Sequence, residues 1–231
     1  GIRDYKVTGV QTCALPIWSD QPEKDGRYKK IAVSEEKVDE FFANVFFQAH
    51  PEAPNQIILD LDATDDPLHG RQEGRFFHAY YGGYCYLPLY VFCGDFLLCA
   101  RLRTADKQPA AGALSEIEGI VKRLRARWPE VRVLVRGDSG FCREELLAWC
   151  EGHDVDYLFG LARNKRLEAM LSPGMSEAKQ QFDATGKAAR VFSELRYQTL
   201  ESWSCERRVV GKAEYLEKGS NPRFVVTNLS P

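Results

Sequence analysis

The chain has 231 residues, of which 44% are hydrophobic and 28% are charged, and its net charge at pH 7 is −2. This length suffices for one sizeable domain, or for one domain that carries an insertion. A weakly acidic chain does not bind polyanions through its overall charge, so any contact with nucleic acid must come from local basic patches. No apolar run approaches the roughly 18 residues of a membrane span, so we expect no membrane partner. The cysteines form no CxxC pair, which favours free thiols over zinc ligands or disulfides.

The N-terminal segment, residues 1–17, does not read as part of a fold. Residues 7–17 (VTGVQTCALPI) match the translation of a common short-read sequencing adapter, and residues 1–4 fit the adapter bases before it. The segment lacks the charged start, apolar core and cleavage site of a signal peptide. We therefore expect residues 1–17 to be an adapter artefact and residues 18–56 to form a connector and one helix. The alternative is a genuine, weakly patterned N-terminal segment.

That helix is expected at residues 34–49 (SEEKVDEFFANVFFQA), where apolar side chains recur at helical spacing. Ser34 is a suitable N-cap, and prolines at 51 and 54 end the helix. The next stretch, IILDLDATDDPLHG at 57–70, opens with a short apolar run. Such a run, bounded by turn residues, is typical of a buried strand.

Several carboxylates lie at the C-terminal end of this strand. Asp60 and Asp62 are two residues apart, so their side chains point to the same face of the strand. Two carboxylates at the mouth of a buried strand are costly unless a positive charge compensates them. A divalent cation is the usual compensation. The alternative is a solvated strand end with a capping Asp.

The rest of the chain predicts a mixed sheet with helices. In chain order we expect strands within 76–93 and at 96–103, a helix at 110–128, a strand at 131–137, a helix at 143–152, a strand at 156–161 and a helix that ends near 171. Short connections favour an antiparallel meander for the first strands, and the apolar stripe of 110–128 favours a core-facing helix. A polar loop is expected at 172–189, followed by strands at 190–203, 206–215 and 223–228.

A second strand also ends on an aspartate. Residues 131–141 (VRVLVRGDSGF) alternate valines with other residues and stop at a Gly-Asp-Ser-Gly turn that contains Asp138. In open α/β sheets, sites form outside the carboxyl ends of the strands. Two strands that each deliver an Asp at that end predict a shared metal site.

These motifs, taken in order, resemble the catalytic domain of a DDE-type bacterial insertion-sequence transposase. The stretches that carry the resemblance are IILDLDATDDPLHG, GGYCYLPLYVFC, VLVRGDSGF and VDYLFGLARN, and it covers residues 28–231. It suits the cut-and-paste branch with a β-rich insertion. The resemblance implies an α/β fold, a ribonuclease H-like mixed sheet flanked by helices, with the insertion near the C-terminus. Residues 57–171 would then form the catalytic core, which is incomplete, and residues 172–231 a truncated insertion.

The resemblance also implies the site. In that family, the Asp of a DxT motif on the first strand and an Asp after the fourth strand are catalytic and bind metal; here these are Asp62 and Asp138. Asp60 and Thr64 are expected to lie next to these two aspartates and to hold them in position without binding the metal themselves. The implied cofactor is Mg²⁺, with Mn²⁺ as an alternative, and the implied reaction is DNA strand cleavage and strand transfer at element ends. The family's third ligand, a Glu on a helix after the insertion, has no counterpart in the sequence. We therefore expect an internal fragment that is inactive as given.

DNA is the partner that the resemblance implies, both as element ends and as target. Basic residues near the strand ends would bind phosphates without reading sequence. The candidates are Arg71, Arg75, Arg163, Lys165 and Arg166; ordinary surface charge is the alternative reading of each. The resemblance further implies a cytoplasmic location in a bacterium, with a homodimer as one form of the active complex.

Two other functions remain open. LDLDATD matches the nucleophile motif of a haloacid-dehalogenase-type phosphatase, with Asp60 as nucleophile and Asp62 as acid and base, and the Gly-Asp-Ser of 137–139 resembles its late metal motif. That motif requires a further acid where Cys142 stands, and the predicted meander disagrees with a fully parallel sheet. The non-enzyme alternative is a DNA-binding remnant without catalysis.

Overall fold

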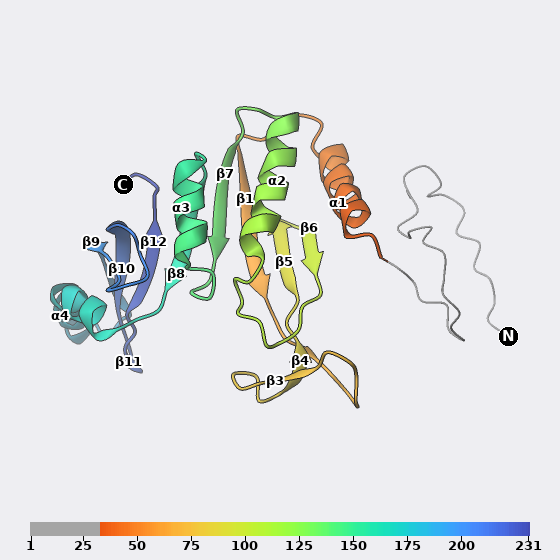
Figure 1. The fold of residues 1–231 in the computed structure, drawn as a ribbon. Helices are drawn as coiled ribbons and strands as arrows, with labels where there is room; N and C mark the ends of the chain where they lie inside the picture. Colours follow the sequence, from red (N-terminus) through yellow and green to blue (C-terminus); the bar gives the residue numbers. More distant parts are fainter. Residues whose placement is uncertain (1–32) are drawn as a thin grey trace, which may run out of the picture. The chain divides into compact units, whose positions relative to one another are not determined.

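The computed structural model describes residues 33–231 (Figure 1). The chain divides into two units, Gly1–Ala53 and Pro54–Pro231. The described part of the first unit holds helix α1 (Glu35–Ala49), which confirms the predicted helix. Ser34 caps it by accepting a hydrogen bond from the backbone N–H of Lys37, one of the free donors of the first turn. The expected adapter artefact at 1–17 lies outside the described residues.

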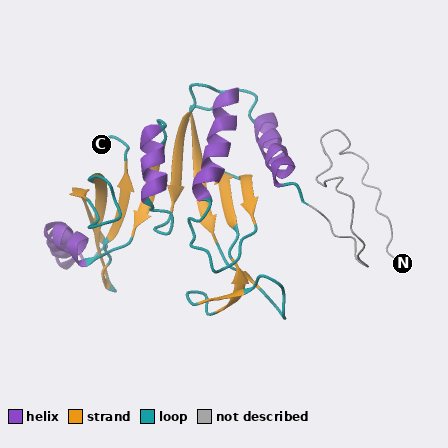
Figure 2. Ribbon diagram, viewed as in Figure 1, coloured by secondary structure: helices purple, strands orange, loops and turns teal. Residues whose placement is uncertain are grey.

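The second unit is built on a mixed sheet (Figure 2). Strand β1 (Gln56–Ala63) pairs antiparallel with β5 (Leu89–Cys93), which pairs antiparallel with β6 (Phe96–Arg101). On its other side β1 pairs parallel with β7 (Arg132–Gly137), and β7 pairs parallel with β8 (Asp156–Leu161). An antiparallel meander of three strands followed by two parallel strands is the ribonuclease H-like arrangement, so the predicted fold class is confirmed.

Helices α2 (Ala113–Arg127) and α3 (Glu144–Gly152) lie over the same face of this sheet (Figure 1). Each connects two parallel strands, and right-handed crossovers that advance in one direction place their helices on one face. The core between the layers is apolar: Leu59 and Val135 of the strands and Ile117 and Leu147 of the helices are fully buried. None of the helices in the described ranges combines the length and apolar character that crossing a bilayer requires.

The β-rich insertion continues the same sheet. Strand β12 (Arg223–Thr227) pairs antiparallel with β8, and β10 (Arg207–Leu216) pairs with β12, with β9 (Ala189–Tyr197) and with β11 (Gly219–Ser220). The strand order is therefore β11-β10-β12-β8-β7-β1-β5-β6, with β9 beside β10. The three predicted strands after residue 189 are confirmed, and backbone hydrogen bonds between β12 and β8 join them to the rest of the sheet.

The predicted loop at 172–189 is wrong over most of its length, because helix α4 (Lys165–Thr185) continues through it. Pro173 lies inside this helix. A proline there removes a backbone hydrogen bond, which is why the sequence favours an earlier end. The helix continues because its apolar face packs on the insertion: the ring centroids of Phe182 and Tyr215 are 5.3 Å apart. Tertiary packing outweighs the local penalty.

The aromatic stretch at 76–93 is divided between two sheets, whereas the sequence analysis placed it in one meander. Only its last part forms β5. The earlier part belongs to a separate sheet of β2 (Asp66–Pro67), β4 (Gly83–Tyr86) and β3 (Phe76–His78), in the order β2-β4-β3. Cys85 and Leu87 pack with Ala105 in a small buried cluster. This excursion between β1 and β5 therefore has a core of its own.

The six cysteines of the described residues are free thiols, as predicted. Burial raises the pKa of Cys142 to about 11 and that of Cys150 to about 12. Both thiols therefore stay protonated at neutral pH and serve as packing side chains.

Candidate metal site and nucleic-acid interface

The parallel pairing of β1 and β7 stops just before the two predicted aspartates. The last pair is Asp60 opposite Arg136. Asp62, near the end of β1, and Asp138, directly after β7, each follow this pair by two residues, so both lie at the same end of two neighbouring strands. Both aspartates are exposed at the carboxyl ends of their strands, where a cation can reach them.

A tight turn fixes Asp138 directly after β7. Its Oδ1 accepts a hydrogen bond of 2.8 Å from the backbone N–H of Gly140. Its carbonyl oxygen accepts one of 3.2 Å from the backbone N–H of Phe141. Phe141 is buried and anchors the turn in the core. Because Oδ1 takes part in the turn, Oδ2 is the freer oxygen for a cation.

Strand β8 approaches this turn so closely that position 160 requires glycine. A Cβ at Gly160 would lie 3.0 Å from the backbone nitrogen of Ser139 and 3.3 Å from the carbonyl carbon of Asp138. The register of β7 and β8 pairs Gly137 with Phe159, so Gly160 comes next to Asp138. With no side chain at position 160, β8 can pack directly against the turn that holds Asp138.

Asp60 lies behind Asp62 on the same face, as predicted, and it forms an ion pair that the sequence analysis missed. Nε and Nη2 of Arg136 donate to its two carboxylate oxygens at 2.6 and 2.7 Å. The hydrogen bond to Asp60 raises the pKa of Arg136. A bidentate arginine occupies both oxygens of Asp60, so this carboxylate neutralises a neighbouring charge and is not free to bind metal. The sequence contained a sign of this ion pair. Arg136 follows Asp60 by the same number of residues as Asp138 follows Asp62.

Tyr81 is a further neighbour of the site that the sequence analysis did not name. Its Oη lies 3.5 Å from the carbonyl oxygen of Ala63, the residue after Asp62. Burial raises the pKa of Tyr81, and the negative charges of Asp65 and Asp62 raise it further. Thr64, the other predicted supporting residue, is exposed just beyond the end of β1.

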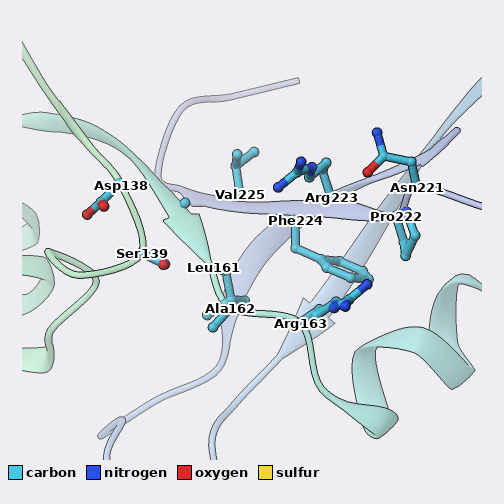
Figure 3. Close-up of a pocket in the computed structure, with 11 residues that line it drawn as sticks. Asp138, Ser139, Leu161, Ala162, Arg163, Asn221, Pro222, Arg223, Phe224 and Val225 are labelled. Atoms are coloured by element: carbon cyan, nitrogen blue, oxygen red, sulfur yellow. The ribbon is translucent and has the colours of Figure 1, made fainter. Parts of the chain in front are cut away.

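A pocket of about 670 Å³ connects the site to the insertion (Figure 3). Asp138 and Ser139 lie on one side of it in Figure 3, and Arg163, Asn221 and Arg223 lie on the other. Arg163 follows β8 and Arg223 opens β12; both are exposed, and neither forms an ion pair with another described residue. Two unpaired guanidinium groups across the pocket from Asp138 suit the phosphates of a nucleic acid. Arg163 is one of the predicted DNA-binding residues. Arg223 is not, because the sequence does not indicate that β12 pairs with β8.

The other basic candidates are spread over two regions. Arg166 donates to the carbonyl oxygen of Gln198 at 3.2 Å and stacks on the ring of Tyr197. Arg75 lies over the ring of Tyr84 in the small sheet. Arg71 and Lys165 are exposed, without an ion pair to any described residue. The structure therefore brings Arg163 to Asp138 and holds Arg71 and Arg75 on the excursion between β1 and β5.

Asp62 and Asp138 suit a hard divalent cation, because carboxylate oxygens are the ligands that Mg²⁺ prefers. Within residues 33–231, no group of three or more His, Cys, Asp or Glu side chains is placed to hold a metal ion. Glu214, one of the acids in the insertion, instead accepts hydrogen bonds from Arg190 at 2.5 Å and from Lys212 at 3.0 Å. The described part of the site thus offers two carboxylates.

The sequence matches the family described as Transposase DDE domain group 1 over residues 20–231. Among solved structures, the chain is similar to the piggyBac transposase in the cryo-EM structure of its synaptic complex with hairpin DNA. The sequence identity is 12% and the TM-score 0.44, and the similarity covers 85% of this chain and 37% of that chain. No curated protein matches the chain. Because the family match spans nearly the whole sequence, the chain belongs to the transposase DDE domain group 1 family.

Proposed function

We propose that Asp62 and Asp138 form the metal-binding centre of a transposase that cleaves DNA at the ends of its element and joins them to a target. The observation that supports this proposal is the register of β1 and β7: Asp62 and Asp138 each follow the last pair of the ladder, Asp60 and Arg136, by two residues. The family match supports the reaction class. We propose Mg²⁺ as the metal, with Mn²⁺ as a substitute.

The chemistry is a phosphoryl transfer in two steps. In the first step, water attacks a phosphodiester, the P–O bond to the element end breaks, and a 3′-hydroxyl is released. In the second, that hydroxyl attacks a phosphodiester of the target DNA, a P–O bond of the target breaks, and a 3′-hydroxyl of the target strand leaves. Divalent cations held by Asp62 and Asp138 would activate the attacking oxygen and stabilise the leaving oxygen.

The surrounding residues have separate tasks in this proposal. Arg136 neutralises Asp60, so the charge that attracts the cation is concentrated on Asp62 and Asp138. Arg163 and Arg223 hold phosphates across the pocket from Asp138. Gly160 lets β8 pack against the turn that holds Asp138.

We further propose that the 231-residue chain does not cleave DNA by itself. Two carboxylates carry a charge of −2, which two divalent cations exceed, so a third acid is needed to hold the second cation firmly. No third acid joins Asp62 and Asp138 within the described residues. A nucleophile misplaced by about 1 Å can lose on the order of a hundredfold in rate.

A strand-cleavage assay on labelled element ends tests the proposal. Two chains are compared: the chain of residues 1–231, and a longer chain that includes the Glu-bearing helix implied by the family resemblance. With Mg²⁺, the longer chain should nick and join DNA, and Asp62→Asn or Asp138→Asn should abolish both reactions while DNA binding persists. Full cleavage by either variant would show that these carboxylates are not the catalytic pair. Robust cleavage by the shorter chain would show that the third ligand lies within it.

The second candidate is a DNA-binding chain without catalysis, which the two-carboxylate site favours. The phosphatase reading is weaker, because both oxygens of its nucleophile, Asp60, are engaged by Arg136. The antiparallel β5 beside β1 also departs from a fully parallel sheet.

A further inference from the structure

The small sheet presents an unusual concentration of exposed aromatic rings. Four exposed aromatic side chains meet in two ring pairs, and we call them the aromatic cluster: Phe77, Tyr80, Tyr81 and Tyr84. Phe76 is also exposed, but as the neighbour of Phe77 on β3 it points to the opposite face. Tyr80 is 85% exposed and Phe77 58%. Single exposed apolar side chains are normal, but a contiguous group of them marks a binding surface.

The hairpin that carries the cluster is held firmly. Strands β3 and β4 pair with Phe77 opposite Tyr84, and their rings meet edge to face with centroids 5.7 Å apart. Tyr80 and Tyr81 form a second edge-to-face pair at 5.0 Å. Cys85 anchors β4 in the buried cluster described above. The rings are therefore preorganised while much of their surface stays open to solvent.

The cluster lies beside the candidate metal site. The chain enters the small sheet directly after Asp62 and returns along β5, where Tyr90 stands opposite Asp62. Within the cluster, Tyr81 reaches back to the carbonyl oxygen of Ala63 at 3.5 Å. Any DNA end bound at Asp62 and Asp138 therefore ends next to these rings.

The charges around the cluster indicate how it binds. The guanidinium of Arg75 lies 4.6 Å from the ring centroid of Tyr84, where it can meet a phosphate. Asp65, Asp66 and Glu73 on the same excursion oppose a purely electrostatic attraction to DNA. Aromatic side chains, however, bind the π-face of any unpaired base, and this stacking tolerates sequence differences. Unpaired bases with one nearby phosphate fit this surface.

We propose that the aromatic cluster is a stacking surface for unpaired bases of DNA next to the strand break. The inference rests on the proposed function, which places a DNA end at Asp62 and Asp138. The cluster holds one or more bases out of the duplex, and Arg75 contacts the backbone phosphate beside them. This orients the end relative to the carboxylates.

The test measures binding of the chain of residues 1–231 to labelled duplexes by fluorescence anisotropy, without added metal. One duplex ends in a single-stranded thymidine overhang; the other carries an overhang of abasic sites with the same number of phosphates. We expect the thymidine overhang to bind at least about fivefold more tightly, the lower limit for one stacked base. Tyr80→Ala and Phe77→Ala should remove this preference. Phe192→Ala is the matched control, because Phe192 is 65% exposed on β9 outside the cluster, and it should keep the preference.

Equal affinity of the unsubstituted chain for the two overhangs would overturn the inference. So would a preference that survives both cluster substitutions. A third contrary outcome is a stable dimer in sedimentation that Tyr80→Ala converts to monomer, because the cluster would then be a self-association surface. Absence of a base preference in the unsubstituted chain, with metal-dependent cleavage by the longer chain intact, would reject this inference alone; a persistent preference without cleavage by the longer chain would reject the proposed function alone.

Discussion

Asp60 and Asp62 are two residues apart on β1, yet their carboxylates have different surroundings. Both oxygens of Asp60 are bound by Arg136, whereas Asp62 is exposed. Sequence alone shows two similar acids on one face. Because β7 sets Arg136 opposite Asp60, the charge of Asp60 is neutralised. Asp62 has no such arginine opposite it in the ladder of β1 and β7.

Asp60→Asn is expected to leave the metal site intact. Its partner Arg136 is about half exposed, so loss of this pair should cost no more than about 1 kcal/mol of unfolding free energy. Urea unfolding measures the cost, and the cleavage assay on the longer chain should show activity retained. If the unsubstituted protein instead hydrolyses a phosphomonoester and Asp60→Asn abolishes this hydrolysis, Asp60 is a nucleophile and the phosphatase reading is correct.

Gly160→Ala should destabilise the fold and disturb Asp138. The added Cβ would lie 3.0 Å from a backbone nitrogen, so β8 must shift away from the turn, at a cost of about 1–3 kcal/mol. Gly152→Ala is the matched control, because a Cβ at Gly152 meets open space. Its unfolding free energy should be unchanged or slightly higher. Equal stability of the two variants would show that the contact at position 160 is easily relieved.

One buried arginine of the insertion, Arg207, forms ion pairs with helix α3. Arg207 of β10 is 3% exposed and donates to Glu144 Oε2 at 2.6 Å and to Glu151 Oε1 at 2.6 Å. Tyr157 of β8 also donates to Glu151 at 2.8 Å. One side chain thus links a helix of the core to a strand of the insertion.

Arg207→Met should lower the unfolding free energy by about 2–3 kcal/mol. Breaking a fully buried pair costs about 3–5 kcal/mol, and the two glutamates here are about one-third exposed, which reduces the cost. The control is Arg132→Met, which removes a largely exposed pair with Asp156 and should cost no more than about 1 kcal/mol. Similar losses in the two variants, measured by urea unfolding, would contradict the role given to Arg207.

The same pair predicts acid sensitivity. Hydrogen bonds from Arg207 lower the pKa of Glu144 and of Glu151 below their ordinary value of 4.5. A lowered folded-state pKa stabilises the protein above the ordinary value, and this stabilisation is lost as the pH falls through the folded-state pKa. Unfolding free energy measured from pH 6 downward should fall more steeply below pH 4.5 for the unsubstituted chain than for Arg207→Met. Parallel curves would show that these glutamates are not stabilised by Arg207.

The sequence predicts best those helices and strands in which apolar residues recur at a regular spacing. The apolar stripe that ends with Leu124 identifies α2, and the alternating valines identify β7. The continuation of α4 past Pro173 depends on packing against β9 and β10, which no local pattern contains. The small sheet was missed because its aromatic residues have the composition of a core strand although most of their rings are exposed.

At the scale of the whole second unit, the catalytic strands and the insertion share one hydrogen-bonded sheet through β8 and β12. Sequence predicts both parts but not this junction, because pairing between distant strands has no local signal. The junction is what brings Arg223 into the pocket with Asp138. DNA affinity should therefore depend on both parts.

Arg163→Gln and Arg223→Gln should each weaken DNA binding and reduce its salt dependence. Each lost phosphate contact lowers the slope of log K against log salt by about 0.9 for duplex DNA. Arg196→Gln on β9 is the control: Arg196 is exposed but does not line the pocket, so its slope should match that of the unsubstituted chain. Identical slopes for all three variants would mean that the pocket does not hold phosphate.

Binding of Mn²⁺, followed by electron paramagnetic resonance, decides whether Asp62 and Asp138 share one divalent cation. The chain of residues 1–231 is titrated with Mn²⁺ beside Asp62→Asn, Asp138→Asn and a control, Asp95→Asn, whose exposed carboxylate lies in the turn between β5 and β6. We expect one site that is lost in either of the first two variants and kept in the control. Mn²⁺ binding that survives both Asp62→Asn and Asp138→Asn would show that the two carboxylates do not share a cation.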